Sequence, residues 1–211
     1  MLITRPNHDI TTNYLYFWSE ILITKARKTG YPVVDLSRKR ANKKELLSII
    51  KKVNPNFIVF NGHGNDSTIF GYDNEPLIEV GINEELLNSK IVYARSCSAV
   101  KKLGKSSIKN GCSSFIGYDD EFVFIIDNDI ISHPLQDTTA KLFLDPSNYI
   151  VLLLLKGHTV SEANRRSKEK YRQTILNHMI STTKQEDRDL IPFLARNYIH
   201  QVCLGNQEAT I

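Results

Sequence analysis

The stretch NPNFIVFNGHGN, residues 54–65, decides the fold class. Its apolar run Phe57–Phe60 shows no polar alternation, which is typical of a strand covered on both faces of a parallel sheet. Polar residues end the run at once, and His63 follows with a glycine on each side. The stretch therefore predicts a buried central strand that delivers a histidine at its carboxyl end.

A second segment of the chain has the same form. The apolar run Ile91–Ala94 is followed directly by Arg95-Ser96-Cys97-Ser98. In open parallel sheets, functional groups gather at the carboxyl ends of the strands. If the two strands are neighbours, His63 and Cys97 face one crevice.

Working outward, short apolar runs alternate with segments of helical periodicity, together with a hairpin over Ser67–Val80. Predicted strands cover Leu2–Thr4, Tyr31–Leu36, Phe57–Phe60, Ile91–Ala94 and Ser114–Gly117, and predicted helices cover Asn13–Arg27, Asn42–Val53, Asn83–Leu87 and Val100–Asn110. The alternation predicts an α/β fold with a mostly parallel sheet flanked by helices. We expect Leu2–Thr4 to be an edge strand.

The C-terminal part is predicted to be mostly helical. Helices are expected up to Asp145-Pro146, over Asn148–Lys156, from Thr159 to about Ile180 and over Asp187–Arg196, before a closing strand over Tyr198–Leu204. Thr159 and Glu162 form a capping box, which marks where one helix begins. With no repeat or linker in the sequence, we expect one domain over residues 1–211.

The composition is that of a globular protein. Of the 211 residues, 41% are hydrophobic and 24% are charged, and 27 Lys and Arg against 23 Asp and Glu give a net charge of +4. This small excess does not argue for nucleic-acid binding. The longest apolar run, Ile150–Leu155, is too short to cross a bilayer. We therefore expect a soluble, cytoplasmic protein with no membrane contact.

Cysteine and histidine spacing indicates neither a disulfide framework nor a metal centre. The three cysteines, Cys97, Cys112 and Cys203, form no C-x-x-C pair. The histidines other than His63 show no ligand spacing, and they are His8, His133, His158, His178 and His200. We expect no metal and no cofactor.

His63 and Cys97 suit nucleophilic catalysis. The thiolate is the attacking form of cysteine, and a nearby base must take its proton and later protonate the leaving amine. Glycine allows the backbone to approach a substrate closely. The amides of Gly64 and Cys97 are candidates for an oxyanion hole.

These motifs resemble the caspase-fold cysteine peptidases, which include caspases, metacaspases, legumain, gingipains, separase and CHAT-domain proteases. In that group a His-Gly pair ends one central strand and the catalytic cysteine ends the next. Segments 110–118 (NGCSSFIGY) and 157–163 (GHTVSEA) are also similar to CHAT and gingipain-like members. The resemblance covers roughly residues 1–205. It implies a caspase-like endopeptidase acting on protein or peptide substrates, in some relatives after activation by a partner protein.

The resemblance also suggests where substrate specificity lies. The residue two positions before the cysteine commonly lines the pocket for the side chain before the scissile bond, and here it is Arg95. An arginine fork suits a carboxylate, so cleavage after Asp or Glu is one expectation. Asp119 and Asp120 leave other cleavage preferences open. They can neutralise Arg95, or can themselves select a Lys or Arg side chain of the substrate. A surface Arg95 paired with one of these aspartates is the alternative without a substrate role.

Two other functions compete with the peptidase. Ala99–Ser106 has the A-x-x-x-x-G-K-S form of a phosphate-binding loop, but Gly111 leaves too short a helix behind it. A catalytically inactive caspase-fold binding module is the other. The basic stretch Arg165–Arg172 is interpreted as a solvated helix face partnered by Glu162 and Glu169.

Overall fold

The computed structural model describes residues 1–211 and shows an α/β protein built on a mostly parallel, six-stranded sheet. The strand order is β2-β1-β3-β6-β7-β8, and only β8 is antiparallel to its neighbour. The strands are β1 (Leu2–Arg5), β2 (Val34–Ser37), β3 (Phe57–Asn61), β6 (Ile91–Arg95), β7 (Ser114–Tyr118) and β8 (Gln201–Gly205). A separate antiparallel hairpin joins β4 (Thr68–Phe70) to β5 (Pro76–Glu79).

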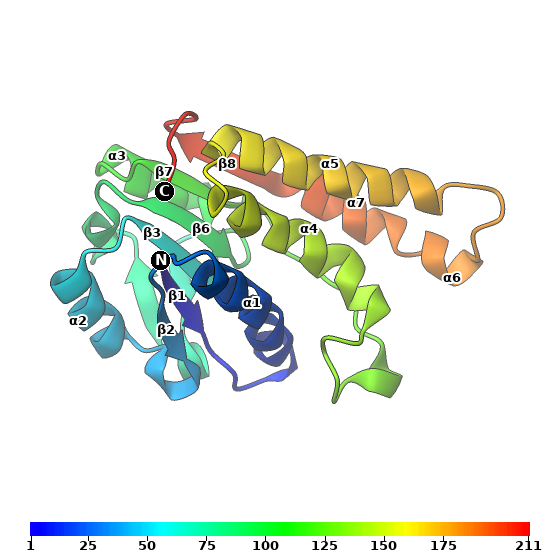
Figure 1. The fold of residues 1–211 in the computed structure, drawn as a ribbon, viewed down its shortest axis with the longest axis horizontal. Coiled ribbons are helices and arrows are strands. Elements are labelled where there is room, and N and C mark those ends of the chain that lie inside the picture. Colours follow the sequence, from blue (N-terminus) through cyan, green and yellow to red (C-terminus); the bar gives the residue numbers. More distant parts are fainter.

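Seven α-helices surround this sheet (Figure 1). They are α1 (Ile10–Lys28), α2 (Lys43–Val53), α3 (Lys105–Lys109), α4 (Thr138–Leu154), α5 (Val160–His178), α6 (Gln185–Arg188) and α7 (Ile191–His200). Short 3-10 helices cover Arg38–Arg40, Tyr72–Asn74, Glu84–Leu87 and Asn128–Ile130, and a π-helical turn (η4) covers Val100–Gly104. Helices α5 and α7 lie side by side and extend beyond the sheet (Figure 1). None of the helices combines the length and apolar character needed to cross a membrane.

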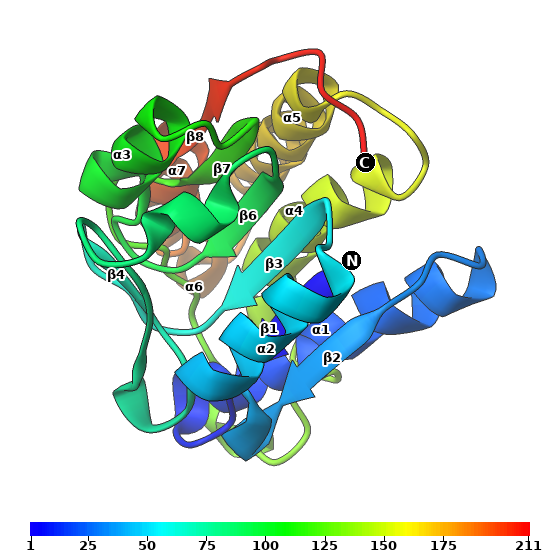
Figure 2. The same ribbon diagram turned by 90° about the vertical axis from the view of Figure 1, so that its left-hand side faces the viewer.

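Each face of the sheet has its own hydrophobic core, because successive side chains of a strand point to opposite faces. Phe57, Val59 and Tyr93 pack in the core beneath α1, α4 and the start of α5. Ile58 and Phe60 pack on the other face, beneath α2 and η4. The two layers are visible in Figure 2, where α2 and α1 lie on opposite sides of the sheet.

Two local expectations are wrong. Leu2–Thr4 is not an edge strand, because β1 pairs with both β2 and β3. The helix does not end at Pro146, which lies inside α4. Proline in a helix costs about 3 kcal/mol, and the burial of Leu144 and Ile150 on either side outweighs that cost. The segment after Cys97 is helical as expected, with the π-helical turn η4 continuing directly into α3.

Most other expectations for the C-terminal part are confirmed. The helix expected over Asp187–Arg196 is divided into α6 and α7, however, and the closing strand begins at Gln201 because Tyr198 belongs to α7. Thr159 caps α5 by accepting a hydrogen bond from the amide of Glu162. The closing strand β8 pairs with β7 at the sheet edge. On α5, Arg166 pairs with Glu162 and Arg172 with Glu169, as predicted for a solvated face.

Candidate functional site

The two central strands β3 and β6 carry His63 and Cys97 to the same edge of the sheet. They are parallel neighbours, and their register places Asn61 opposite Arg95. His63 and Cys97 each follow two residues beyond that pair, in the loops at the carboxyl ends of the two strands. The sequence expectation that these strands are adjacent is confirmed.

The loop after β3 depends on two glycines. Gly62 has a φ of +136°, and a Cβ there would lie 3.0 Å from Pro6 Cγ. A Cβ on Gly64 would lie 2.9 Å from Ser96 Cβ and 3.1 Å from the Cys97 carbonyl oxygen. Only glycine allows such close approach. The loop therefore presses against both the N-terminal segment and the Cys97 turn.

The imidazole of His63 is held by a carboxylate. Its Nε2 lies 2.6 Å from Oδ2 of Asp9, the residue that caps the N-terminus of α1. Burial would raise the pKa of Asp9, but hydrogen bonds from Thr12 and His63 outweigh it and hold that pKa below its usual range. Asp9 is thus an ionised partner that fixes the orientation of the ring.

Sequence reasoning did not nominate Asp9 as a functional residue. Asp9 and His63 are 54 positions apart in the chain. The only local signal was the helix-capping spacing from Asp9 to Thr12, which points to a structural role. The contact arises because the N-terminus of α1 follows β1, the strand beside β3.

The thiol of Cys97 rests among backbone and acidic groups. Its Sγ lies 3.8 Å from the Phe122 carbonyl oxygen, and it makes no hydrogen bond with His63. Burial raises the pKa of Cys97. The resting side chain is therefore a neutral thiol, and an attacking thiolate requires a base that comes to it.

Two backbone amides beside the thiol are free to bind an oxyanion. Neither the Gly64 nor the Cys97 N–H donates a hydrogen bond within the protein. Gly64 pairs with Ile69 in an antiparallel bridge, but the two hydrogen bonds of this bridge are made by its neighbours. The His63 carbonyl accepts from the amide of Phe70, and the Asn65 amide donates to the carbonyl of Thr68. The amide of Gly64 itself therefore points away from β4. Free amides next to a nucleophile are the groups that stabilise a tetrahedral intermediate.

Arg95 does not lie on the surface, and both sequence interpretations of it are wrong in this structure. The side chain is fully buried. Its guanidinium donates to Asn61 Oδ1 at 2.6 Å and to Asn148 Oδ1 at 2.7 Å, with Ser147 and Ser19 as further partners. Strand alternation explains this, because Arg95 shares the face of Tyr93 and points beneath α1 and α4. A buried, saturated guanidinium has no donor left for a substrate carboxylate.

Asp119 and Asp120 lie near the Cys97 turn without contacting Arg95. The Asp120 carbonyl accepts a hydrogen bond from the amide of Ser98 at 2.8 Å. Their carboxylates face α7, where Asp119 pairs with His200 and Asp120 with Arg196. They form an acidic rim beside Cys97, although basic side chains partly neutralise it.

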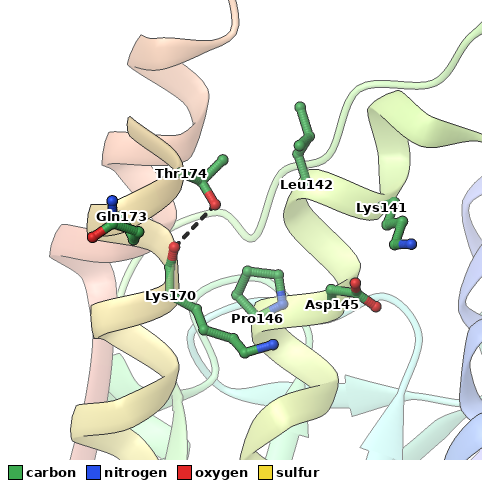
Figure 3. A pocket seen from close by; sticks show the side chains of 7 residues that line it. All are labelled: Lys141, Leu142, Asp145, Pro146, Lys170, Gln173 and Thr174. Carbon is green, nitrogen blue, oxygen red and sulfur yellow. Dashed lines mark hydrogen bonds between the residues drawn. The ribbon is translucent and has the colours of Figure 1, made fainter. Parts of the chain in front are cut away.

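Other features do not build a competing site. The Ala99–Ser106 stretch is helical, and the amides of Lys102 and Leu103 donate to the Asp66 carbonyl, so they cannot cradle a phosphate. A hollow of about 270 Å³ lies between α4 and α5 (Figure 3). Its lining includes Lys141, Asp145 and Lys170 but neither histidine nor cysteine.

The structure adds one grouping of side chains that the sequence pattern did not indicate. His8 has no ligand spacing in the sequence, yet the structure gathers His8, Asp9 and His63 so that their nitrogen and oxygen ligand atoms lie within 4.8 Å of one another. Ligand spacing along the sequence does not detect this group, because His8 and Asp9 lie between β1 and α1 whereas His63 follows β3.

Comparison with known proteins adds no name to the site. No protein-family model and no curated protein matches the chain.

Proposed function

We propose that the chain is a cysteine endopeptidase with a caspase-like fold, in which Cys97 is the nucleophile and His63 the general acid and base. One observation supports the proposal: β3 and β6 are parallel neighbours, and a His-Gly pair follows one of them while a cysteine follows the other. This is the arrangement that the resemblance to caspase-fold peptidases implies. The mostly parallel sheet, the helical C-terminal part and the closing strand are consistent with it.

The proposed reaction runs through an acyl-enzyme. Cys97 Sγ attacks the carbonyl carbon of the scissile peptide bond while His63 takes the thiol proton. The oxyanion is stabilised by the Gly64 and Cys97 amides, and His63 then protonates the leaving amine. His63 next removes a proton from water, which attacks the thioester and releases the acid product and the Cys97 thiol.

His63 and Cys97 are bonded to other groups in the structure, so substrate binding must bring them together for the reaction. His63 is bonded to Asp9, and Cys97 contacts the Phe122 carbonyl. Catalytic hydrogen bonds often form only when substrate is present. We infer that a bound peptide brings the ring and the thiol together, while Asp9 keeps the ring oriented.

The acidic rim favours a basic residue before the scissile bond. With Arg95 enclosed, the charged groups nearest Cys97 that remain accessible are Asp120 and Glu121, which pair with Arg196 on α7. A substrate Lys or Arg would compete with Arg196 for these carboxylates. Cleavage after basic residues therefore replaces cleavage after Asp or Glu as the expected preference.

A cleavage profile tests the proposal. Wild type and Cys97→Ala are incubated with a denatured proteome, with and without calcium, and new N-termini are read by mass spectrometry. Cys203→Ala is the matched control, because Cys203 is also free and partly exposed. We expect cuts by wild type and Cys203→Ala that Cys97→Ala does not make.

Absence of such cuts leads to a second measurement. A thiol probe is applied, and the labelling of Cys97 is compared with that of Cys112 and Cys203. Selective labelling of Cys97 would point to a protease that awaits an activating partner. Equal labelling together with no cuts would favour the inactive binding module and would sink the peptidase proposal.

A further inference from the structure

The segment Pro6–Asp9 holds an imidazole that forms no hydrogen bond. The His8 side chain is only 10% exposed, and neither of its ring nitrogens forms a hydrogen bond. Leaving a buried polar group unpaired costs about 1–3 kcal/mol. Its ring packs edge-on against Tyr72 at 5.4 Å and lies 6.0 Å from the ring of His63. The nearest charged group to this ring is the Asp9 carboxylate, whose Oδ2 lies 3.5 Å from His8 Nε2.

Asp9 presents one free oxygen to both rings. Its Oδ1 accepts the hydrogen bond from the amide of Thr12 that caps α1. Its Oδ2 faces the imidazoles, 2.6 Å from His63 Nε2 and 3.5 Å from His8 Nε2. One oxygen of the carboxylate therefore caps the helix, and the other contacts the two histidine rings.

We propose that His8, Asp9 and His63 form a zinc site. Two imidazole nitrogens and one carboxylate oxygen are a common zinc ligand set, with a fourth position left to water. With bonds of about 2.0–2.1 Å, ligand atoms of a tetrahedral zinc ion lie about 3.3 Å apart. The three groups lie within 4.8 Å of one another, so small side-chain rotations bring them to that spacing.

The backbone around these ligands is fixed. Thr12 Oγ1 accepts hydrogen bonds from the amides of His8 and Asp9, and so closes the capping box. Pro6 packs against Gly62, and Asn61 donates to the carbonyl of Thr4. The site is open from outside, since about a third of the His63 and Asp9 side chains is exposed. The Asp9 charge offsets the positive N-terminal end of α1, which by itself disfavours a cation.

Zinc at this site would inhibit the peptidase, an inference that rests on the proposed function. A neutral imidazole that binds zinc through one nitrogen carries its proton on the other, so neither nitrogen could accept the proton of Cys97. The ring would also be held away from Cys97 by the ion. Removal of the ion would release His63 for catalysis. The structure thereby assigns His8, which is no part of the proposed reaction, to its control.

Zinc titration of the purified chain tests the site directly. Zn²⁺ binding to the metal-free protein is measured by competition with a chromophoric chelator, for wild type and His8→Gln. We expect binding by wild type and an affinity at least about 100-fold lower for His8→Gln, since loss of even a supporting residue costs 10–100-fold. His133→Gln is the matched control, because His133 is exposed and bonds only its neighbour Ser132. Its affinity should equal that of wild type.

Two further variants keep the result unambiguous. His8→Cys supplies another zinc ligand at the same place, so restored binding would show that His8→Gln had not merely unfolded the protein. Cys97→Ser should bind zinc like wild type. Loss of binding in Cys97→Ser would move the ion to Cys97 and overturn the ligand set, as would equal affinity in wild type and His8→Gln.

Cleavage assays separate this proposal from the peptidase proposal. With an active wild type, zinc should inhibit, and His8→Gln should need at least about 100-fold more zinc for the same inhibition. Equal inhibition of the two would refute the regulatory role. Zinc binding that depends on His8, in a chain that cuts nothing, would keep the site and count against the peptidase.

Discussion

The last residues of the two central strands differ sharply from the residues two positions beyond them. Asn61 and Arg95 are fully buried, and their polar groups are bonded to each other and to α1 and α4. His63 and Cys97 are partly exposed, and each has one hydrogen-bonding partner. The buried pair fixes the strand ends, whereas the outer pair keeps groups free for chemistry.

This difference teaches that position along the strand, and not residue type, decides which polar group is available for function. An arginine side chain is well suited to bind a carboxylate. The Arg95 side chain nevertheless links β3, β6 and α4 through its hydrogen bonds to Asn61 and Asn148. Histidine and cysteine lie just beyond the enclosed layer. Substitutions in the outer pair should therefore affect activity, and substitutions in the buried pair should affect stability.

The largest effect is expected at His63. His63→Ala removes the proposed general acid and base, a group that typically supplies 10²–10⁴-fold, so peptide cleavage should fall by about 10³-fold or more. The thermal midpoint should change little, because the ring is about a third exposed. Cleavage kinetics and thermal melts check both parts, with His133→Ala as the control. A large loss of stability with little loss of cleavage would reverse the roles of the two pairs.

Arg95→Ala should destabilise the fold by about 3 kcal/mol. It leaves a cavity and removes the donors that satisfy the buried Asn61 and Asn148 side-chain oxygens. Urea denaturation measures the change. Arg172→Ala is the control, since Arg172 forms an exposed ion pair with Glu169 and its loss should cost less than about 0.5 kcal/mol.

The same variant tests the corrected role of Arg95. Where Arg95→Ala remains folded, at low temperature, its cleavage-site preference should match that of wild type. A changed residue preference before the scissile bond would show that the guanidinium reaches the substrate after all.

Asp9 both caps α1 and holds the His63 ring, and two substitutions separate these roles. Asp9→Asn keeps the helix cap but removes the charge that holds His63, and we expect cleavage to fall about 10- to 100-fold as the ring loses its orientation. Asp9→Ala should add a loss of about 1 kcal/mol in stability from the missing cap. Comparison of kcat and of the urea midpoint for the two variants checks this. Equal stability of both would mean that the cap contributes nothing.

Much of the fold could be predicted from the sequence because its signals are local. The apolar runs Phe57–Phe60 and Ile91–Ala94 lie within β3 and β6, and the Thr159 side chain caps the start of α5. The adjacency of β3 and β6 stayed a condition of the sequence argument, met in the structure, and only the family resemblance implied it. Pro146 was misjudged because the burial of α4 outweighs a local helix-breaking preference, and such burial is a property of the whole fold.

The site was only half predictable for a related reason. His63 and Cys97 follow their strands directly, so their positions could be inferred from the chain. The partners of Arg95 and His63 could not, because Asn148, Asp9 and His8 come from distant elements. Because side chains alternate along a strand, the sequence could have shown that Arg95 points to the same face of the sheet as Tyr93. It could not have shown that helices cover Arg95 on that face.

The smallest effect is expected in the ionisation of Cys97, and it shows how far the outer pair is assembled at rest. Burial raises the pKa of Cys97, so its thiolate fraction at pH 7 should be lower than that of an ordinary cysteine. Its alkylation rate should therefore keep rising at pH values above those that ionise a free thiol. Cys112 should react more slowly still, because it is buried and its pKa is raised to about 12.

The pH dependence of alkylation, read by mass spectrometry, measures this, and His63→Ala provides the comparison. Because His63 contacts Asp9 and not Cys97 at rest, the substitution should leave the profile of Cys97 unchanged within a few-fold. An apparent pKa below 7 that His63→Ala abolishes would mean that thiolate and imidazolium are already paired without substrate. The outer pair would then be preassembled like the buried pair, and the comparison between them would rest on exposure alone.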